Sequence, residues 1–140
     1  MALLCKNACV YLFNKHGYVM LLKCRSSGLW MTPGGKIEEN IDDTPFAGMM
    51  REFQEETNVR FPVHNSKVVD FYRWKDTMVY LVMMNHRFPS VFEKTKETVA
   101  MRFVHFSKIQ SMHNLKHYVG KAYRDLNIGS NIKAVTYNHM

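Results

Sequence analysis

Cysteine is scarce in this sequence, and no paired-cysteine motif occurs in it. Only three cysteines are present, Cys5, Cys9 and Cys24, and no two of them form a Cys-x-x-Cys pair. A disulfide framework and a paired-cysteine zinc site are therefore excluded. We interpret the three cysteines as reduced thiols, which predicts a cytoplasmic protein.

Long apolar runs are also missing. No stretch approaches the roughly 20 residues needed to cross a bilayer, and we regard the apolar start at residues 1–4 as too short for a signal peptide. We therefore expect no membrane partner. The chain also has no Walker A loop, no Gly-x-Ser-x-Gly elbow and no internal repeat, so these motifs indicate no competing enzyme class.

The sequence is rich in hydrophobic residues and in positive charge. Hydrophobic residues make up 46% of the 140 positions, which indicates a globular chain of one domain, residues 1–140. The formal net charge is +7, which favours polyanionic partners such as nucleotides, nucleic acid or inositol phosphates. The sequence predicts no particular oligomeric state.

The hydrophobic pattern predicts strands and helices in a mixed order. Runs rich in β-branched and aromatic residues predict strands over 7–13, 18–24, 29–32, 67–74, 77–85 and 99–106. An apolar stripe at helical spacing predicts the last helix over 113–126. Residues 128–140 show no clear period, so we expect a mobile tail there. This order of elements predicts a layered α/β domain.

A central helix is expected to begin at Pro45. Thr44 is a good N-cap, and proline suits the first helical position because its missing N–H costs nothing there. Asn58 is a plausible end, because asparagine tolerates the left-handed conformation that follows many helices. Gly48 lies inside this helix and has two explanations that we leave open. It either packs closely on the sheet or leaves room for phosphate or metal beside Glu52.

Three carboxylates of this helix share one face. Glu52, Glu55 and Glu56 stand at i, i+3 and i+4, where like charges cost a few tenths of a kcal/mol per pair. Arg51 can neutralise one of them, most simply Glu55 at i+4. A divalent cation such as Mg²⁺, which prefers oxygen ligands, would turn the remaining repulsion into binding. The alternative is a solvated helix face.

The Gly-Gly turn before this helix and the acidic face together form a longer motif. The residues concerned are Gly35, Arg51, Glu52, Phe53, Glu55, Glu56 and Val59. In type and spacing they resemble the Nudix box of the Nudix hydrolases, of the small MutT-like kind, which runs G-x5-E-x7-R-E-U-x-E-E-x-G-U, U being a bulky aliphatic or similar residue. The resemblance implies a Nudix-type α/β/α sandwich, with a mixed β-sheet and a loop-helix catalytic box. It also implies hydrolysis of a nucleoside diphosphate linked to another group.

Three departures from the box are visible. Counted back from Arg51, the first acidic position of the pattern falls on Asp43. The loop between Gly35 and Asp43 is two residues longer than the pattern allows, and Asn58 replaces the glycine after the helix. The resemblance implies a mainly structural role for the first acidic position, so we expect activity to survive these changes.

The resemblance further implies that the acidic face binds one to three Mg²⁺ or Mn²⁺ ions. The implied ligands are Glu52, Glu55 and Glu56, with the carbonyl group of Gly35 and with Glu38. Arg51 would orient a catalytic carboxylate, most plausibly Glu55. The general base stays open among Glu55, Glu56 and a distal acid.

Glu97 and Glu93 are the candidates for that distal acid. Both come shortly before the strand predicted over 99–106, near the place where Nudix enzymes often carry a further acid. The alternative for both residues is an exposed loop charge.

The Trp-x-x-Pro-Gly-Gly sequence before the helix is also similar to the Nudix family. The candidate substrate-binding residues are Trp30, Gly34, Gly35 and Lys36. Burial habits make Trp30 a core anchor in the alternative interpretation. This short form resembles the branch that cleaves (d)NTPs, including oxidised purine nucleotides. The positive charge keeps capped RNA, dinucleoside polyphosphates and diphosphoinositol polyphosphates as alternatives, and a non-catalytic nucleotide- or RNA-binding module is a further one.

A basic stripe lies on the last predicted helix. His117, Lys121 and Arg124 would share one face of it, and Lys121 and Arg124 are candidate contacts for RNA or another polyanion. The alternative is a solvated face that keeps the protein soluble.

Overall fold

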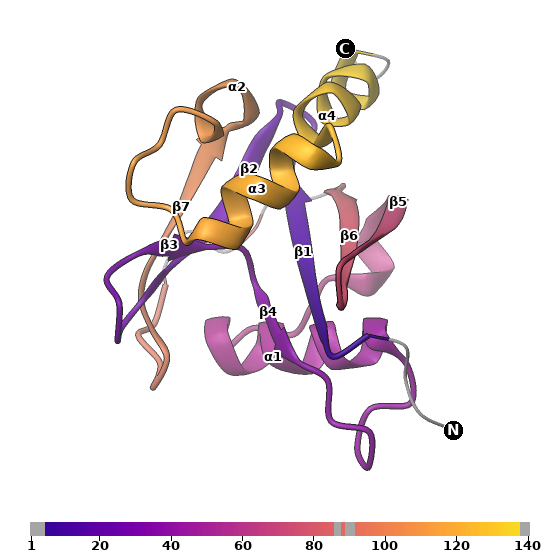
Figure 1. The fold of residues 1–140 in the computed structure, drawn as a ribbon, viewed down its shortest axis with the longest axis vertical. Coiled ribbons are helices and arrows are strands. Elements are labelled where there is room, and N and C mark those ends of the chain that lie inside the picture. The colour runs from indigo at the N-terminus through magenta and orange to yellow at the C-terminus, as the bar shows by residue number, and fades with distance from the viewer. Residues whose placement is uncertain (1–4, 86–87, 89–91, 138–140) are drawn as a thin grey trace.

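The computed structural model describes residues 5–85, 88 and 92–137, and its centre is a mixed β-sheet (Figure 1). The strands are β1 (Asn7–Phe13), β2 (Tyr18–Cys24), β3 (Trp30–Met31), β4 (Gly34–Lys36), β5 (Ser66–Trp74), β6 (Thr77–Met84) and β7 (Thr98–His105). The helices are α1 (Pro45–Thr57), α2 (Phe106–Ile109), α3 (His117–Asp125) and α4 (Ile128–Tyr137), with a 3-10 turn, η1, at Val63–Asn65. Each predicted strand is present within two residues of its expected ends, and β4 is an addition.

Strand β1 lies at the centre of the sheet and pairs with three other strands. It pairs in parallel with β6 and antiparallel with β2 and β4, while β2 also pairs with β3 and β7. Among the strands that the structure describes, β5 pairs with β6 alone and forms one edge. Because β4 leads directly into the loop before α1, its pairing with β1 fixes where the acidic helix begins.

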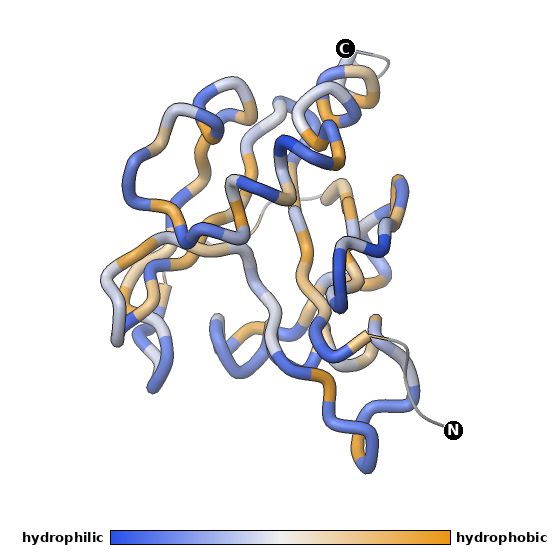
Figure 2. Tube along the Cα trace, in the orientation of Figure 1, coloured by the Kyte–Doolittle hydropathy of each residue, from blue (hydrophilic) through white to orange (hydrophobic). Residues whose placement is uncertain are grey.

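Helices cover both faces of the sheet, as the predicted α/β/α arrangement requires. Helix α3 crosses in front of β1 and α1 lies behind β4 (Figure 1). The hydroxyl group of Tyr11 in β1 donates a 2.8 Å hydrogen bond to the carbonyl group of Val119 in α3. On α1, Met49 and Phe53 are fully buried. Figure 2 shows hydrophobic colour along β1 and hydrophilic colour along much of α1, which presents only one face to the core.

Helix α1 begins and ends where the sequence predicts. The Oγ1 atom of Thr44 accepts a 3.1 Å hydrogen bond from the backbone N–H of Ala47, and Pro45 is the first helical residue. Asn58 ends the helix with a φ of 62°, in the left-handed region. The substitution of asparagine for the usual glycine is therefore accommodated without a change of backbone path.

The last helix predicted over 113–126 is wrong at its start. Helix α3 begins at His117, because the preceding segment pairs with Trp30. The N–H of Trp30 donates to the carbonyl group of Asn114, and the N–H of Lys116 donates to that of Trp30, both at 2.8 Å. These bonds hold the backbone extended where helical spacing alone predicted a helix.

The expectation of a mobile tail is also wrong for most of its length. Residues 128–137 form α4, in which Ile128 and Ile132 are fully buried and Thr136 is nearly so. These three residues are spaced by four and form a narrow buried stripe, in which the two isoleucines are apolar. Residues 138–140 lie outside the described part. Within that part, no helix has the length and apolar character needed to span a bilayer.

Candidate active site

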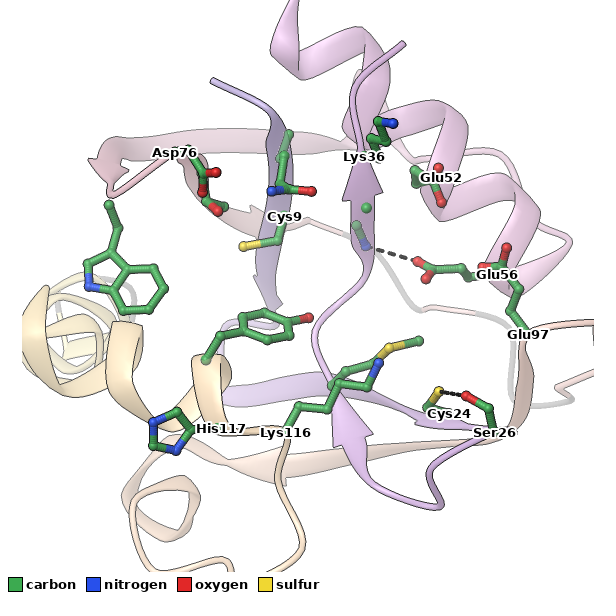
Figure 3. Close-up of a pocket in the computed structure, with 18 of the residues that line it drawn as sticks. Cys9, Cys24, Ser26, Lys36, Glu52, Glu56, Asp76, Glu97, Lys116 and His117 are labelled. Atoms are coloured by element: carbon green, nitrogen blue, oxygen red, sulfur yellow. Dashed lines mark hydrogen bonds between the residues drawn. The ribbon is translucent and has the colours of Figure 1, made fainter. Parts of the chain in front are cut away.

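Three carboxylates meet at one side of the molecule. Glu52 and Glu56 come from successive turns of α1, and Glu97 comes from the residue just before β7. One carboxylate oxygen of each lies within 4.8 Å of the others, and Figure 3 shows the three side chains together. The structure therefore brings the distal acid Glu97, and not Glu93, to the helix face.

Glu56 is the buried member of this acidic cluster. Its side chain lies against β4, where Oε1 accepts a 2.9 Å hydrogen bond from the backbone N–H of Gly34. Burial raises the pKa of Glu56 to about 9, while that hydrogen bond and the nearby Lys116 act in the opposite direction. Glu52 and Glu97 raise it further, so the cluster is a place where added positive charge is strongly favoured.

Two glycines lie beside the cluster. A Cβ atom on Gly35 would lie 2.7 Å from the carboxylate of Glu52, closer than real Cβ atoms approach other atoms. Gly34 has a φ of +146° and runs against the backbone of Ala8 and Cys9 in β1. Gly34 and Gly35 thus allow β4 to pass tightly between β1 and the acidic helix.

Burial also raises the pKa of Glu52, and the neighbouring carboxylate of Glu55 adds to this effect. Arg51 opposes it, since its Nη1 atom lies 3.2 Å from Oε1 of Glu52. One guanidinium group therefore offsets only part of the repulsion between the acids.

Glu97 is positioned by its backbone rather than by its side chain. The N–H of Arg25, directly after β2, donates a 2.8 Å hydrogen bond to the carbonyl group of Glu97. Arg25 also donates from Nη2 to the carbonyl group of Thr95 at 2.7 Å. The next residue, Thr98, donates from Oγ1 to the carbonyl group of Glu56 at 2.6 Å, which ties the start of β7 to α1.

Asp43, on which the first acidic position of the pattern falls, is not the acid that contacts Arg51. Asp42 is the residue that pairs with Arg51, through Nε–Oδ1 and Nη2–Oδ2 distances of 3.0 and 2.8 Å. Asp42 also accepts a 2.9 Å hydrogen bond from the N–H of Glu38, whereas Asp43 is exposed. The extra loop residues let the chain make this turn one residue earlier than a count along the pattern predicts.

Gly48 makes room for this carboxylate. A Cβ atom there would lie 2.9 Å from Oδ2 of Asp42. The glycine inside α1 therefore leaves space for the carboxylate of Asp42, which pairs with Arg51. This explanation differs from the two that the sequence left open.

Glu55 stands apart from the cluster. Its side chain is 50% exposed, and its Oε1 atom lies 3.2 Å from Nη1 of Arg51, as the i, i+4 spacing predicted. Glu38 is exposed and contributes its backbone to the loop rather than its carboxylate to the cluster. Glu93 accepts a hydrogen bond from Asn58 at the end of α1.

A cavity of about 990 Å³ opens beside the cluster. It reaches from the acidic helix to the end of β5 and the first turns of α3. Its charged lining is mainly basic, and the cationic residues are Arg25, Lys36, Lys75, Lys96, Lys116 and Lys121. Figure 3 shows Glu52, Glu56 and Glu97 at one side of this pocket and Asp76 at the other. A basic cavity with a carboxylate cluster at one side suits a ligand that carries phosphate groups.

The predicted substrate-binding residues divide into two groups. Gly34, Gly35 and Lys36 line the pocket. Trp30 does not; it is 8% exposed, and the guanidinium carbon of Arg102 lies 5.4 Å from its ring centroid. Its alternative interpretation as a core anchor fits this position.

The residues of the predicted basic stripe also differ in whether they line the pocket. Lys121 lines the pocket, whereas Arg124 is 61% exposed on its side chain and lies 3.7 Å from Asp125. His117, at the start of α3, also lines the pocket.

Sequence reasoning missed two residues that shape the site. Asp42 could have been found from the run of two adjacent acids, either of which can reach Arg51 across a loop of uncertain length. Arg25 had no sequence signal, because its role depends on the pairing of β2 with β7.

A model of the NUDIX domain matches residues 4–126 of the sequence. The chain belongs to the Nudix family. Membership confirms the expected class, a Nudix pyrophosphohydrolase. Nudix hydrolases generally use a divalent metal, and this chain carries an acidic cluster of Glu52, Glu56 and Glu97. A search of curated proteins gave no match.

Solved structures with the Nudix fold are similar over nearly the whole chain. The MutT protein from Methanosarcina mazei Go1 is 20% identical, with 91% of each chain covered and a TM-score of 0.58. A C. elegans Ap4A hydrolase, in a binary complex, is 15% identical, with 94% of this chain and 96% of that chain covered and a TM-score of 0.63. The NUDIX domain of Shewanella oneidensis NrtR, complexed with ADP ribose, is 16% identical, with 91% and 90% covered and a TM-score of 0.58. At these identities the likeness shows the fold.

Proposed function

We propose that this protein is a metal-dependent hydrolase that cleaves the pyrophosphate linkage of nucleoside di- and triphosphates or their derivatives, with (d)NTPs as the first substrates to test. The observation that carries the proposal is the meeting of Glu52, Glu56 and Glu97 within 4.8 Å beside a basic cavity. A solvated helix face does not explain why Glu97, from a distant part of the sequence, lies beside Glu52 and Glu56.

The donor set fits Mg²⁺ or Mn²⁺. Hard divalent cations take carboxylate oxygens, and the three acids offer several of them at short mutual distances. The buried Glu56 has a raised pKa, and a cation would favour its charged form. Glu52, Glu56 and Glu97 are therefore the proposed ligands, with the carbonyl group of Gly35 as a further one and Glu55 as a neighbour that adjusts Arg51.

When bound, such an ion neutralises phosphate charge and makes a coordinated water more acidic. The residues of the chain supply the rest. Lys36 and Lys116 line the same cavity and can bind non-bridging phosphate oxygens. We assign the proton of the attacking water to the carboxylate oxygen of Glu97 that would not contact the ion, because Glu97 is the exposed member of the cluster. The water oxygen forms a bond to phosphorus, and the bridging oxygen leaves with the second phosphate group.

The size of the cavity supports a nucleotide as the substrate. A volume of about 990 Å³ suits a mononucleotide with its phosphate groups. The similar structures include an Ap4A hydrolase and a NUDIX domain complexed with ADP ribose, so nucleotide derivatives larger than (d)NTPs belong in the test. Capped RNA has weaker support, because Lys121 lines the cavity and Arg124 does not.

The test is phosphate release from a panel of (d)NTPs, oxidised purine nucleotides, Ap4A, ADP-ribose, cap analogue and a diphosphoinositol polyphosphate. We expect Mg²⁺- or Mn²⁺-dependent cleavage of at least one nucleotide, abolished by EDTA. Nucleotide binding without cleavage of any member, with either metal, would contradict the proposal and favour a binding module.

A further inference from the structure

A row of side chains crosses the floor of the pocket from strand to strand. In the sheet, Trp74 of β5 pairs with Thr77 of β6, Thr77 pairs with Asn7 of β1, and Asn7 pairs with Lys36 of β4. Directly paired residues point their side chains to the same face of a sheet. All four residues line the pocket, so its floor runs from Lys36, beside the acidic helix, to Trp74 at the sheet edge.

The indole ring at the far end of this row is held in place. Its Nε1 atom donates a 3.1 Å hydrogen bond to Oδ2 of Asp125 at the end of α3. The Nζ atom of Lys75 lies 4.7 Å from the ring centroid. The side chain of Trp74 is only half-buried, so a fixed aromatic surface faces the pocket and offers a planar ligand a place to stack.

Asp76 adds a hydrogen-bond acceptor beside that ring. Its backbone carbonyl group accepts from the N–H groups of Lys6 and Asn7 at 2.7 and 3.2 Å, which fixes the β5–β6 turn against β1. Its carboxylate lines the pocket and has no hydrogen bond or ion pair to any residue that the structure describes. A free carboxylate repels phosphate and accepts hydrogen bonds only, so this end favours an uncharged group that presents N–H donors.

The chemistry of the purines separates the two candidates for such a group. Guanine presents two adjacent donors, N1–H and the exocyclic amino group, which match the two oxygens of one carboxylate. Adenine presents an acceptor, N1, beside its amino group, and this acceptor would meet a carboxylate oxygen. Asp76 is exposed in the free protein, and a stacked base would cover it on one side. Two acceptors that face each other there cannot form a hydrogen bond, which costs binding.

We propose, on the basis of the proposed function, that the Trp74–Asp76 end of the pocket binds the nucleobase and that Asp76 selects guanine over adenine. The base stacks on Trp74, its donor edge meets Asp76, and the phosphate chain runs along the floor past Lys36 to the carboxylates. Trp74 and Asp76 are then specificity-determining residues, distinct from the groups that take part in hydrolysis.

The first test measures equilibrium binding of the α,β-methylene analogues of GTP and ATP, which resist cleavage at that linkage, in Mg²⁺. The wild-type protein should bind the GTP analogue at least tenfold more tightly than the ATP analogue. Asp76→Asn should weaken binding of the GTP analogue at least tenfold and change binding of the ATP analogue little. The substitution keeps the backbone carbonyl group that anchors the turn, so the variant should fold, which a thermal melt checks.

Asp70→Asn is the matched control, because Asp70 is an exposed acid of β5 outside the pocket lining. It should leave both affinities unchanged. Equal binding of the two analogues by the wild-type protein, or an unchanged preference in Asp76→Asn, would overturn the selection of guanine.

The second test addresses stacking. The sequence has two tryptophans, and Trp30 is buried away from the pocket, so a change of intrinsic fluorescence on binding reports on Trp74. Trp74→Leu should remove that change and weaken both analogues by a similar factor, at least tenfold. Unchanged affinity for both analogues in Trp74→Leu would overturn the base-binding assignment.

These outcomes differ from a failure of the proposed hydrolysis. A protein that distinguishes the two analogues and cleaves no nucleotide would contradict the hydrolase proposal and leave the base site standing. A protein that cleaves GTP and ATP equally well and binds both analogues equally would contradict the selection of guanine and leave the hydrolase proposal standing.

Discussion

Arg51 and Asp42 join the helix of the Nudix box to the loop before it. The guanidinium group donates two parallel hydrogen bonds, from Nε and Nη2, to the two oxygens of the carboxylate. The side chain of Asp42 is 3% exposed, and that of Arg51 is 21% exposed. Such bidentate pairs fix geometry as well as adding stability. Arg51 is thereby held where its remaining donor reaches Glu52 and Glu55.

The pair predicts which of two adjacent acids matters for stability. Asp42→Ala removes the partner of a partly buried charge and should lower the free energy of unfolding by about 2–3 kcal/mol. Asp43→Ala, at an exposed position, should change it by less than about 1 kcal/mol, as expected for a charge near a helix N-terminus. Urea denaturation of both variants measures the difference. A larger loss in Asp43→Ala would show that the register of the loop is wrong.

The same pair predicts a dependence of stability on pH. The hydrogen bonds from Arg51 lower the pKa of Asp42 below its ordinary value of 3.8. A lowered pKa contributes stability in full above the unfolded value, and this contribution is lost as the pH falls through the lower folded value. Between about pH 5 and pH 2, the wild-type protein should lose more stability than Asp42→Asn, which carries no charge to titrate. Parallel curves of unfolding free energy against pH would contradict this.

The carboxylates should differ in their importance for turnover. Glu56→Gln removes the buried member of the cluster and should lower kcat at least about a hundredfold in a folded protein. Glu55→Gln, a half-exposed neighbour of Arg51, should cause a loss at least about tenfold smaller. The measurement is steady-state kinetics at saturating Mg²⁺, with circular dichroism to confirm folding. Equal losses would place Glu55 among the ligands, as the sequence first suggested.

Glycine at the turn of the box should be needed for metal affinity. Gly35→Ala places a Cβ atom 2.7 Å from the carboxylate of Glu52, which must move. We expect Mn²⁺ affinity to fall at least about tenfold, a loss near 1.4 kcal/mol, as measured by calorimetry.

Gly120→Ala is the control for this substitution, because a Cβ atom there meets nothing within 4 Å. It lies inside α3, so alanine should raise stability by up to about 1 kcal/mol and leave Mn²⁺ affinity unchanged. An unaltered Mn²⁺ affinity in Gly35→Ala would argue against Glu52 as a ligand.

The helix after the family match should carry part of the core. Ile132 in α4 is fully buried, so Ile132→Ala should destabilise the protein by about 2–5 kcal/mol. Tyr137, on the same helix, is 70% exposed, and Tyr137→Ala should change stability by less than about 0.5 kcal/mol. Thermal melts compare the two. Similar small effects would indicate that α4 detaches in solution.

Local chemistry made the box helix predictable. Its start at Thr44-Pro45 and its end at Asn58 depend on backbone preferences that each residue carries wherever it occurs. The acidic face followed from spacing alone. The strand positions followed from runs of β-branched and aromatic residues, and burial on both faces of the sheet sustains those runs in β1.

The failures occurred where pairing with a distant segment decided the outcome. Leu115 has helical spacing with later apolar residues, yet its neighbours bond to Trp30. The bidentate partner of Arg51, Asp42, lies one residue before the acidic position that the pattern indicates, because the path of a loop is not fixed by counting along a motif. Glu97 was one of two candidates until the bond from Arg25 and the anchor at Thr98 placed it.

The hydrogen bond from Thr98 to Glu56 has a consequence for how the protein matures. Glu52 and Glu56 are ready as soon as α1 forms, because their spacing is local. Glu97 joins them only when β7 has paired with β2. These two strands are far apart in the sequence, and pairings between distant segments form slowly. A partly folded chain would therefore have an incomplete acidic cluster. The complete cluster would form only when β7 pairs with β2.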